Sequence, residues 1–536
     1  MEMKRTIAEF KKYFKIAPQE YTFKIIISII LRALLLLIPV LFSNVINEVT
    51  KSNYNKAIML IIISIIVTVL YRFSECLNNY LYHKLYNKIY QYNYDQIVSV
   101  TNNNSIFSLS RFTMGEYSNI AINDVAVIST FYTNIIMRTV QFLEFIFIYS
   151  YFLNINKFLF LFVLIFSVLI FIISFKTTQK LQNLNNRVKL YLDQVTSSTN
   201  EYFLGIKEIK SFNLFEKIFQ SLKNKTNNYL GANKKYNNNS IYLNQSYLFM
   251  WETVRLLSVI YGIYLLKDNV IEVGVLLIIY NYYQKIIDNF SMVLTVNLDY
   301  RILNVSLDRV KKIFEYSKTK VGKEQMPTVN GEITFKNILY GYRNNPILNK
   351  VSFYIPANSI NVLYSKQSCK KKGVFELLLK LNRQHEGKIK IDNIDINDIG
   401  DNDYFKMLSI TREDPFFFNM SIKENLLLVN NDFDKIVDIC NKIGLDYYLS
   451  FLDKGYDTKL DNPNINSNVK QLLSIARILI KDSKIMLFDE SIDILEVKSR
   501  KRILKILKEL SKDHTIIIST HDEDVIDIAD NIINLD

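Results

Sequence analysis

The stretch FLFLFVLIFSVLIFIISF, from Phe158 to Phe175, contains only two polar side chains, both serines, and is flanked by Lys157 and Lys176. As an α-helix rising about 1.5 Å per residue, it would extend roughly 27 Å, close to the thickness of a bilayer's hydrocarbon core. We therefore expect this stretch to cross a membrane. The chain as a whole is 49% hydrophobic and 13% aromatic, which is too apolar for a disordered polymer.

Five further apolar stretches predict that the chain has six membrane spans. Three of the five are interrupted by tyrosine, glutamine and acidic residues, so we expect those helices to face protein or a polar cavity on one side. The segments after spans two and four are polar but keep a helical period, which predicts helical extensions into the cytoplasm. The five stretches are residues 25–42, 57–73, 131–153, 241–266 and 270–298.

The net charge of +13 is explained by where the basic residues lie. Six lysines and arginines precede the first span, and a second cluster runs from Lys176 to Lys235, whereas the opposite loops carry only four lysines. By the positive-inside rule, this distribution predicts a multi-pass protein of the cell membrane with both termini cytoplasmic. Membrane lipid is then an expected partner, and nucleic acid is not.

The numbers and spacing of cysteines and glycines limit which metal, disulfide and phosphate sites the chain can form. The three cysteines, Cys76, Cys369 and Cys440, are far apart and lack CxxC spacing, so we expect buried packing residues rather than disulfides or zinc ligands. Glycines number only 13 of 536, about a third of ordinary usage. Any phosphate site built from several glycines must therefore be checked residue by residue.

Four sequence segments carry a family resemblance. They are GEYSNIAINDV (115–125), NEYFLGIKEIKSFNLFE (200–216), KIMLFDES (484–491) and TIIISTHD (515–522). In order and spacing the chain resembles an ABC exporter half-transporter over essentially its whole length. The resemblance implies an all-α six-helix transmembrane domain of ABC exporter type followed by an α/β P-loop-type nucleotide-binding domain. The boundaries we expect are 1–318 for the membrane domain, 319–328 for a linker and 329–536 for the nucleotide-binding domain.

The resemblance also implies ATP and Mg²⁺ as cofactors and assigns roles to five residues. An apolar strand ending in Asp489 and Glu490 aims both acids out of its carboxyl end, where doubly wound sheets bind ligands. Asp489 would hold Mg²⁺ through water, and Glu490 would polarise the attacking water. Tyr342 would stack on adenine, Glu413 takes the usual glutamine position, and His521 would contact the γ-phosphate.

The segment SKQSCKKK, residues 365–372, departs from the family's glycine-rich phosphate loop. Only Lys371 keeps its family identity. Ser365, Ser368 and Lys370 stand where glycines allow positive φ and close backbone approach, so a nest of N–H donors is not expected. Lys372 replaces the hydroxyl that coordinates magnesium, which puts a cation where a cation should bind.

The family signature LSGGQ is also altered, and reads INSNV at residues 465–469. Asn466 and Ser467 could still donate hydrogen bonds to a nucleotide. Each preorganised donor removed from a charged transition state costs on the order of 10² to 10³ in rate. We therefore expect degenerate ATPase motifs, and an isolated chain that does not hydrolyse ATP efficiently.

Three functions remain open from the sequence. The first is a non-catalytic or weakly catalytic half of an exporter, paired with a second ABC half-transporter chain, that exports a small peptide-like or amphipathic substrate. The alternative is a transport-dead membrane protein for substrate binding, immunity, sensing or scaffolding. The third is an active homodimeric ATP-driven exporter.

Four charged residues in or near the predicted spans are candidate substrate contacts. A charge at the membrane centre costs about 2.5 to 3.5 kcal/mol by insertion scales, so such residues usually face protein or a cavity. A structural role and a substrate role both fit this pattern. The four residues are Arg32, Glu144, Glu252 and Arg255.

Overall fold

The computed structural model describes residues 2–103, 113–316, 329–342, 345–381, 385–463 and 465–536. The chain divides into two compact units, each described below by itself. The first unit comprises residues 1–97 and 118–311, and the second comprises residues 98–117 and 312–536. The predicted linker, 319–328, lies outside the described residues.

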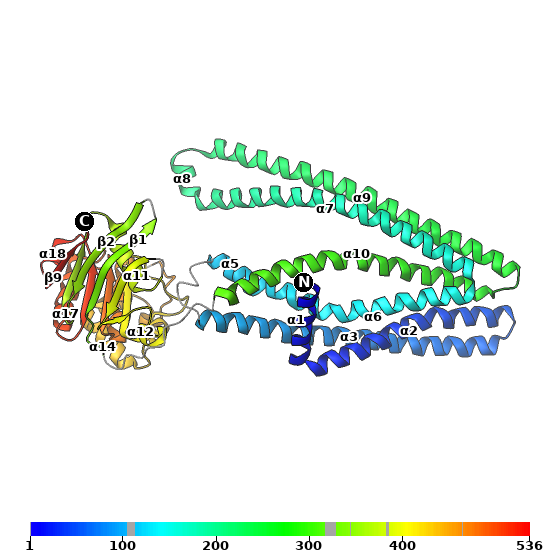
Figure 1. Cartoon of the computed structure of the whole chain (residues 1–536), viewed down its shortest axis with the longest axis horizontal. Helices are drawn as coiled ribbons and strands as arrows, with labels where there is room; N and C mark the ends of the chain where they lie inside the picture. The colour runs from blue at the N-terminus through cyan, green and yellow to red at the C-terminus, as the bar shows by residue number, and fades with distance from the viewer. Residues whose placement is uncertain (1, 104–112, 317–328, 343–344, 382–384, 464) are drawn as a thin grey trace. The chain divides into compact units, whose positions relative to one another are not determined.

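Long helices make up the first unit, because the apolar stretches and the polar segments after them are nearly free of glycine and proline (Figure 1). The helices continue through the polar segments, as their helical period predicts. The turn between α6 and α7 is capped by Asn156, whose side chain accepts hydrogen bonds from the N–H groups of Phe158 and Leu159. The elements up to residue 316 are α1 (Glu2–Ile16), α2 (Pro18–Thr50), α3 (Tyr54–Asn103), α5 (Met114–Asn119), the π-helix η1 (Ile120–Asp124), α6 (Val125–Ile155), α7 (Lys157–Leu204), α8 (Ile206–Ser211), α9 (Phe215–Lys267) and α10 (Val273–Tyr316). Most of α5 and the C-terminal ends of α3 and α10 belong to the second unit.

Five helices are long and apolar enough to cross a membrane by length and composition: α2, α3, α6, α7 and α9. Each contains one of the predicted spans. The sixth predicted span, 270–298, falls mostly in α10, which is helical over 44 residues but more polar, and among the described residues α10 is not one of these five helices. Aromatic side chains from several of these helices, including Trp251, Tyr282 and Tyr283, are fully buried in a shared core.

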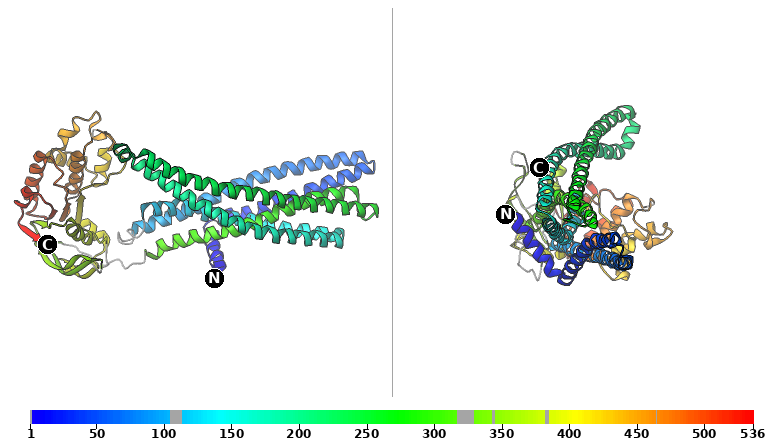
Figure 2. Two further views of the ribbon diagram at one scale, coloured as in Figure 1. Left: turned by 90° about the horizontal axis from the view of Figure 1, so that it is seen from above. Right: turned by 90° about the vertical axis from the view of Figure 1, so that its right-hand side faces the viewer.

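Two β-sheets with helices around them form most of the second unit (Figure 2). One is a four-stranded antiparallel sheet of order β2-β1-β4-β5, and the other is a five-stranded parallel sheet of order β6-β7-β8-β3-β9. The strands are β1 (Ile333–Tyr342), β2 (Asn345–Ile355), β3 (Ile360–Tyr364), β4 (His385–Ile391), β5 (Ile394–Asp395), β6 (Leu408–Arg412), β7 (Ile485–Asp489), β8 (Thr515–Ser519) and β9 (Asn531–Asn534).

The parallel strands β3, β7 and β8 are continuous apolar runs because helices and the other sheet bury both their faces. The helices of this unit are α11 (Ser368–Leu378), α12 (Asp401–Met407), α13 (Ile422–Leu427), α14 (Phe433–Ile443), α15 (Leu445–Leu449), the 3₁₀-helix η2 (Gly455–Asp457), α16 (Ser467–Lys481), α17 (Val497–Leu510) and α18 (Glu523–Ile526).

The cysteines are not all buried. Cys440 is buried in α14, but Cys76 in α3 and Cys369 in the first turn of α11 are exposed. The prediction of three buried packing residues is therefore wrong for Cys76 and Cys369, because both lie on exposed helical surfaces. Among the described residues, no group of three or more His, Cys, Asp or Glu side chains could hold a metal ion.

Candidate functional site

The candidate site lies at the carboxyl edge of the parallel sheet. Because all five strands run in the same direction, the segments that follow β3, β7 and β8 emerge at one edge. The segment after β3 is residues 365–372, here called the phosphate loop, which leads into α11. Glu490 follows β7 directly and His521 follows β8, so the fold brings together residues that are more than 100 positions apart.

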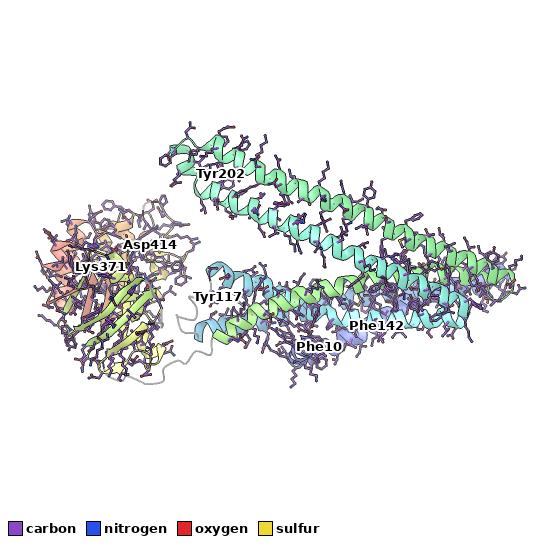
Figure 3. All side chains as sticks on the ribbon, turned by 45° about the horizontal axis from the view of Figure 1, so that its top comes forward. Phe10, Tyr117, Phe142, Tyr202, Lys371 and Asp414 are labelled. Atoms are coloured by element: carbon purple, nitrogen blue, oxygen red, sulfur yellow. The ribbon has the colours of Figure 1, made fainter. Side chains whose placement is uncertain are left out.

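Lys371, which is labelled in Figure 3, lies in the first turn of α11 after β3 and is fully buried. Its Nζ lies 3.1 Å from Glu490 Oε1 and 2.7 Å from His521 Nε2, and it also contacts the carbonyl oxygen of Thr520 at 3.4 Å. The hydroxyl of Ser368 donates to Glu490 Oε1 at 2.9 Å and lies 3.4 Å from His521 Nε2. These four side chains, Ser368, Lys371, Glu490 and His521, are called the Lys371 cluster below. The amine of Lys371 is thus surrounded by partners from its own chain.

Glu490 is held in place by its backbone as well as by the cluster. Its φ of 49° lies in the left-handed region, which is uncommon for a residue with a Cβ. Its N–H donates to the hydroxyl of Ser519 at 2.9 Å and to the carbonyl oxygen of Ser519 at 3.1 Å. Burial opposes ionisation of the Glu490 carboxyl, but hydrogen bonds from Lys371 and Ser368, with the lysine charges, lower its pKa overall. Glu490 is therefore an ionised partner of a buried cation.

Asp489 lines a cavity of about 300 Å³ next to α11. Its Oδ1 accepts a hydrogen bond from Ser519 Oγ at 2.9 Å, and burial raises the pKa of its carboxyl. Lys372 and Glu413 line the same cavity as an exposed ion pair with 3.7 Å between their charged atoms. Asp414, which follows Glu413, lines it too and is labelled in Figure 3. The cavity therefore contains both acids and an ammonium group.

The backbone of the phosphate loop uses several of its N–H donors internally. Within residues 365–372, all of which the structure describes, no residue has a positive φ. The N–H of Gln367 donates to Ser365 Oγ at 3.0 Å, and the N–H of Lys370 donates to the carbonyl oxygen of Gln367 at 3.0 Å. A phosphate nest needs successive N–H groups that point to one centre, and the N–H groups of Gln367 and Lys370 are already used within the loop.

Asp536 supplies an anion to the same loop. Its carboxylate accepts hydrogen bonds from Ser365 Oγ at 2.7 Å and from the N–H of Lys366 at 3.2 Å, and it lies 3.8 Å from Lys370 Nζ. Hydrogen bonding from Ser365 is the main cause of a lowered pKa for this carboxyl. Sequence reasoning missed Asp536, which is 171 positions from Ser365, because the contact depends on the pairing of β9 with β3.

Asp493 is a second residue that sequence reasoning missed. Its Oδ1 accepts a hydrogen bond from Thr520 Oγ1 at 2.6 Å, and its Oδ2 accepts one from the N–H of His521 at 3.2 Å. These bonds tie the segment after β7 to the segment after β8. The sequence signal was only a carboxylate three residues after Glu490, which has no specific meaning alone.

The remaining predicted nucleotide contacts are Asn466, Ser467 and Tyr342. Asn466 is the N-cap of α16, and its side-chain oxygen accepts a hydrogen bond from the N–H of Val469 at 2.9 Å. Asn466 and its neighbour Ser467 are exposed, and among the described residues no hydrogen bond joins them to the cluster. Tyr342 ends β1, but its side chain lies outside what the structure describes.

The four candidate substrate residues form two separate pairs in the first unit. Arg32 of α2 donates to Glu144 Oε2 of α6 at 2.9 Å, and the Glu144 side chain is fully buried. Arg255 pairs with Glu252 on α9, donates to Gln284 Oε1 of α10 at 2.7 Å and lies over the ring of Tyr280. Each arginine thus has a carboxylate partner within its own unit.

Comparison with known proteins matches residues 22–288 to the ABC transporter transmembrane region and residues 348–493 to the ABC transporter family. A putative ABC transporter ATP-binding protein of Mycoplasma genitalium is 30% identical over 224 residues, which are 40% of this chain and 38% of that relative. A putative export ATP-binding/permease protein of Rickettsia typhi is 31% identical over 212 residues, 38% of this chain and 37% of that relative. The chain spans less than two thirds of the length of these two relatives.

A solved structure of a bacterial Atm1-family ABC exporter with ATP bound has a similar fold. It aligns with a TM-score of 0.80 at 19% sequence identity, and the alignment covers 97% of this chain and 94% of that chain. This likeness confirms the predicted fold class, a helical membrane region followed by an α/β nucleotide-binding region.

Proposed function

Because the chain belongs to the ABC transporter family, with an exporter-type membrane region fused to a nucleotide-binding region, we propose that it is a non-catalytic or weakly catalytic half of an exporter. The family uses ATP and Mg²⁺, and the apolar helices make the chain a multi-pass membrane protein. One observation carries the proposal: the ammonium group of Lys371 and the N–H groups of Lys366 and Gln367 already have side-chain partners in the same chain.

The residues at the sheet edge do not fit a bound magnesium nucleotide. A P-loop holds phosphates with convergent N–H groups, a lysine, and a hydroxyl on the metal. Here Lys371 is neutralised by Glu490, the N–H of Lys366 donates to Asp536, and Lys372 stands in the hydroxyl position. The carboxylate oxygens of Asp489 are of the kind that magnesium prefers as ligands, but Asp489 shares its cavity with the ammonium group of Lys372.

Hydrolysis by the isolated chain would lack its main catalytic contributions. A general base accelerates a reaction only when the reacting group is positioned against it. Glu490 and His521 occupy the family positions for the base and the γ-phosphate contact, but they bind Lys371 and Ser368 instead. We therefore propose that these two side chains stabilise the fold in this chain.

A second ABC half-transporter chain is the partner we propose. This chain keeps both segments that resemble coupling helices, and a mere membrane anchor would not need them. The first forms α5 and η1, where Asp124 accepts a hydrogen bond from Ser306 at 2.7 Å, and the second forms α8. The partner would supply an intact phosphate loop, and ATP bound there would face the Asn466–Ser467 segment of this chain.

The proposed substrate is peptide-like or amphipathic. Two charged pairs and many tyrosine and phenylalanine side chains lie within the helical unit, so a ligand with both polar and apolar parts fits this composition. We also propose that both termini are cytoplasmic, because the basic residues cluster on that side. The domain boundaries at 318 and 329 remain part of this proposal.

Purification of the chain with and without a co-expressed second ABC chain tests the proposal. We expect no ATP turnover and weak Mg²⁺–ATP binding by the chain alone, and turnover with the partner present. Tight Mg²⁺–ATP binding by the chain alone would contradict the role given to the phosphate loop. ATP turnover by the chain alone that disappears in its Glu490→Gln variant would instead establish an active homodimer.

A transport-dead membrane protein is the second candidate, and it is favoured by the fact that both the phosphate loop and the signature segment depart from the family pattern. Reconstituted ATP-driven transport with the partner separates the two candidates. Transport that is lost when this chain is mutated would refute the second candidate, and the absence of transport in an otherwise active complex would refute the first.

A further inference from the structure

A cavity of about 300 Å³ lies between α7 and α9 in the first unit. The two helices run side by side towards the turn that holds α8, as Figures 1 and 2 show. Arg187 and Tyr191 line the cavity from α7, and Asn227, Asn228 and Lys235 line it from α9. No carboxylate is among its lining residues. Cationic and neutral donor groups therefore converge on one space from two helices.

The surrounding segments repeat this charge pattern. Residues 176–192 of α7 and 223–240 of α9 hold no aspartate or glutamate, and they contain only basic charges. Those charges are Lys176, Lys180, Arg187, Lys189, Lys223, Lys225, Lys234 and Lys235. Like charges gathered without carboxylates repel one another, and a bound anion relieves that repulsion.

We propose that this cavity binds a phosphate-bearing molecule. An arginine fork, a lysine ammonium, two amide groups and a phenol offer many hydrogen-bond donors, which suits an anion with several oxygens more than a single carboxylate. The volume exceeds what inorganic phosphate needs and leaves room for an organic part of the ligand. The space beside Gly231 on the α9 wall is open, since a Cβ added there would meet no atom within 4 Å.

A neighbouring cavity on the same helix pair shows that this chemistry is local. That cavity, nearer α8, has a volume of about 230 Å³ and is lined by Glu201 and Glu208 as well as by Lys225. Its acids would repel a phosphate group. The cationic cavity is therefore distinct from a general basic coating of the two helices.

Two sources can supply the phosphate group. Arg187 lies 12 residues beyond Phe175, about 18 Å along a straight helix, and Lys235 lies 6 residues before Ile241, about 9 Å from the next apolar stretch. The headgroup region extends only about 5 to 8 Å beyond the hydrocarbon core on each side. A lipid headgroup can thus approach Lys235 more easily than Arg187, and a soluble organic phosphate can approach both.

Pyrophosphate binding to the full chain in phosphatidylcholine nanodiscs tests the proposal by calorimetry. Arg187→Gln combined with Lys235→Gln removes two charges from the cavity. Lys189→Gln combined with Lys234→Gln removes the same charge from exposed positions on the same helices that do not line it. We expect affinity to fall at least about tenfold in the cavity variant, the effect of losing one or two charge-assisted hydrogen bonds, and to fall about twofold or less in the control.

Pyrophosphate held by the lysines of the phosphate loop is common to both variants, so the comparison between them is unaffected. A second arm repeats the titration in nanodiscs that contain phosphatidylglycerol. Competition by this lipid identifies a headgroup as the source, and unchanged binding identifies a soluble phosphate; both results support the site. Equal losses in the two variants, with unchanged helical content by circular dichroism, would overturn it. The inference does not depend on whether the chain hydrolyses ATP.

Discussion

Replacing Glu490 by glutamine tests whether the ion pair at the sheet edge stabilises the fold or performs catalysis. Lys371 is fully buried and Glu490 has a side chain only 15% exposed, so the substitution leaves a buried ammonium without its anion. Breaking a fully buried pair costs about 3–5 kcal/mol, and losing a hydrogen bond to a charged group costs about 1.5–3 kcal/mol. Because Lys371 keeps Thr520 and His521, we expect a loss of about 2–3 kcal/mol.

This loss would lower the unfolding midpoint of the nucleotide-binding region by about 4–12 °C, at roughly 2–4 °C per kcal/mol for a domain of this size. Differential scanning calorimetry of the full chain in detergent measures it. Glu413→Gln is the matched control, since its pair with Lys372 is half exposed and is worth about 0–1 kcal/mol. A double-mutant cycle that combines Glu490→Gln with Lys371→Met should then give a coupling free energy of about 1–3 kcal/mol between the two side chains.

One result would refute this reasoning. If Glu490→Gln left the midpoint unchanged but abolished a measurable ATPase activity of the purified chain, Glu490 would be a catalytic base and not a structural partner of Lys371. The proposal of a non-catalytic half would then fail with it.

Two further predictions concern the sheet edge, and a third concerns the buried ion pair between α2 and α6. Asp536→Asn weakens the anion at the phosphate loop, so in a chain that already carries Arg187→Gln and Lys235→Gln the pyrophosphate affinity should rise several-fold; an unchanged affinity by calorimetry would show that Asp536 does not compete there. The pKa of Glu490 is below its ordinary value of 4.5, so its stabilisation is complete above that pH and is lost as the pH falls through the folded-state pKa. Glu490→Gln removes this contribution, so the unfolding midpoint of the variant should fall less steeply as the pH is lowered. The raised pKa of Asp489 acts in the opposite direction, because it favours the folded state as the pH falls. Calorimetry at pH 3 to 7 measures the midpoint of both chains. Arg32→Met leaves the buried carboxylate of Glu144 unpaired and should cost about 3–5 kcal/mol, and adding Glu144→Met should restore most of the loss; thermal aggregation in detergent measures both, and equal stability of the single and double variants would contradict a buried ion pair.

The apolar stretches and strand-like runs could be predicted from local pattern alone. The stretch 158–175 forms part of α7, and KIMLFDES forms β7, because an uninterrupted apolar run needs no distant information to become a buried strand or a membrane-length helix. The position of Asp489 and Glu490 at the carboxyl end of β7 followed in the same way. The sequence did not predict which side chains meet at this edge of the sheet, because Lys371 could equally have stayed exposed and available to bind a phosphate.

Cys76 and Cys369 show the limit of residue-type averages. Cysteine is among the most buried residue types, but both of these lie on exposed helical surfaces, and only Cys440 is buried. Burial depends on which face of a helix meets its neighbours, and a single cysteine carries no information about that face. The cavity between α7 and α9 was likewise hidden, because the lining residues on α7 are more than 30 positions from those on α9 along the chain.

By itself, the amino-acid sequence determined the division into membrane helices and an α/β region, the order of the motifs and the absence of glycine from residues 365–372. These features are local, since periodicity, apolar length and residue identity act within a few turns of chain. Only the tertiary structure decided that Glu490 pairs with Lys371 and that Asp536 binds Ser365 and Lys366. Those contacts form because the parallel strands β7, β3 and β9 end at one edge of a sheet, where segments distant in sequence come within hydrogen-bonding distance.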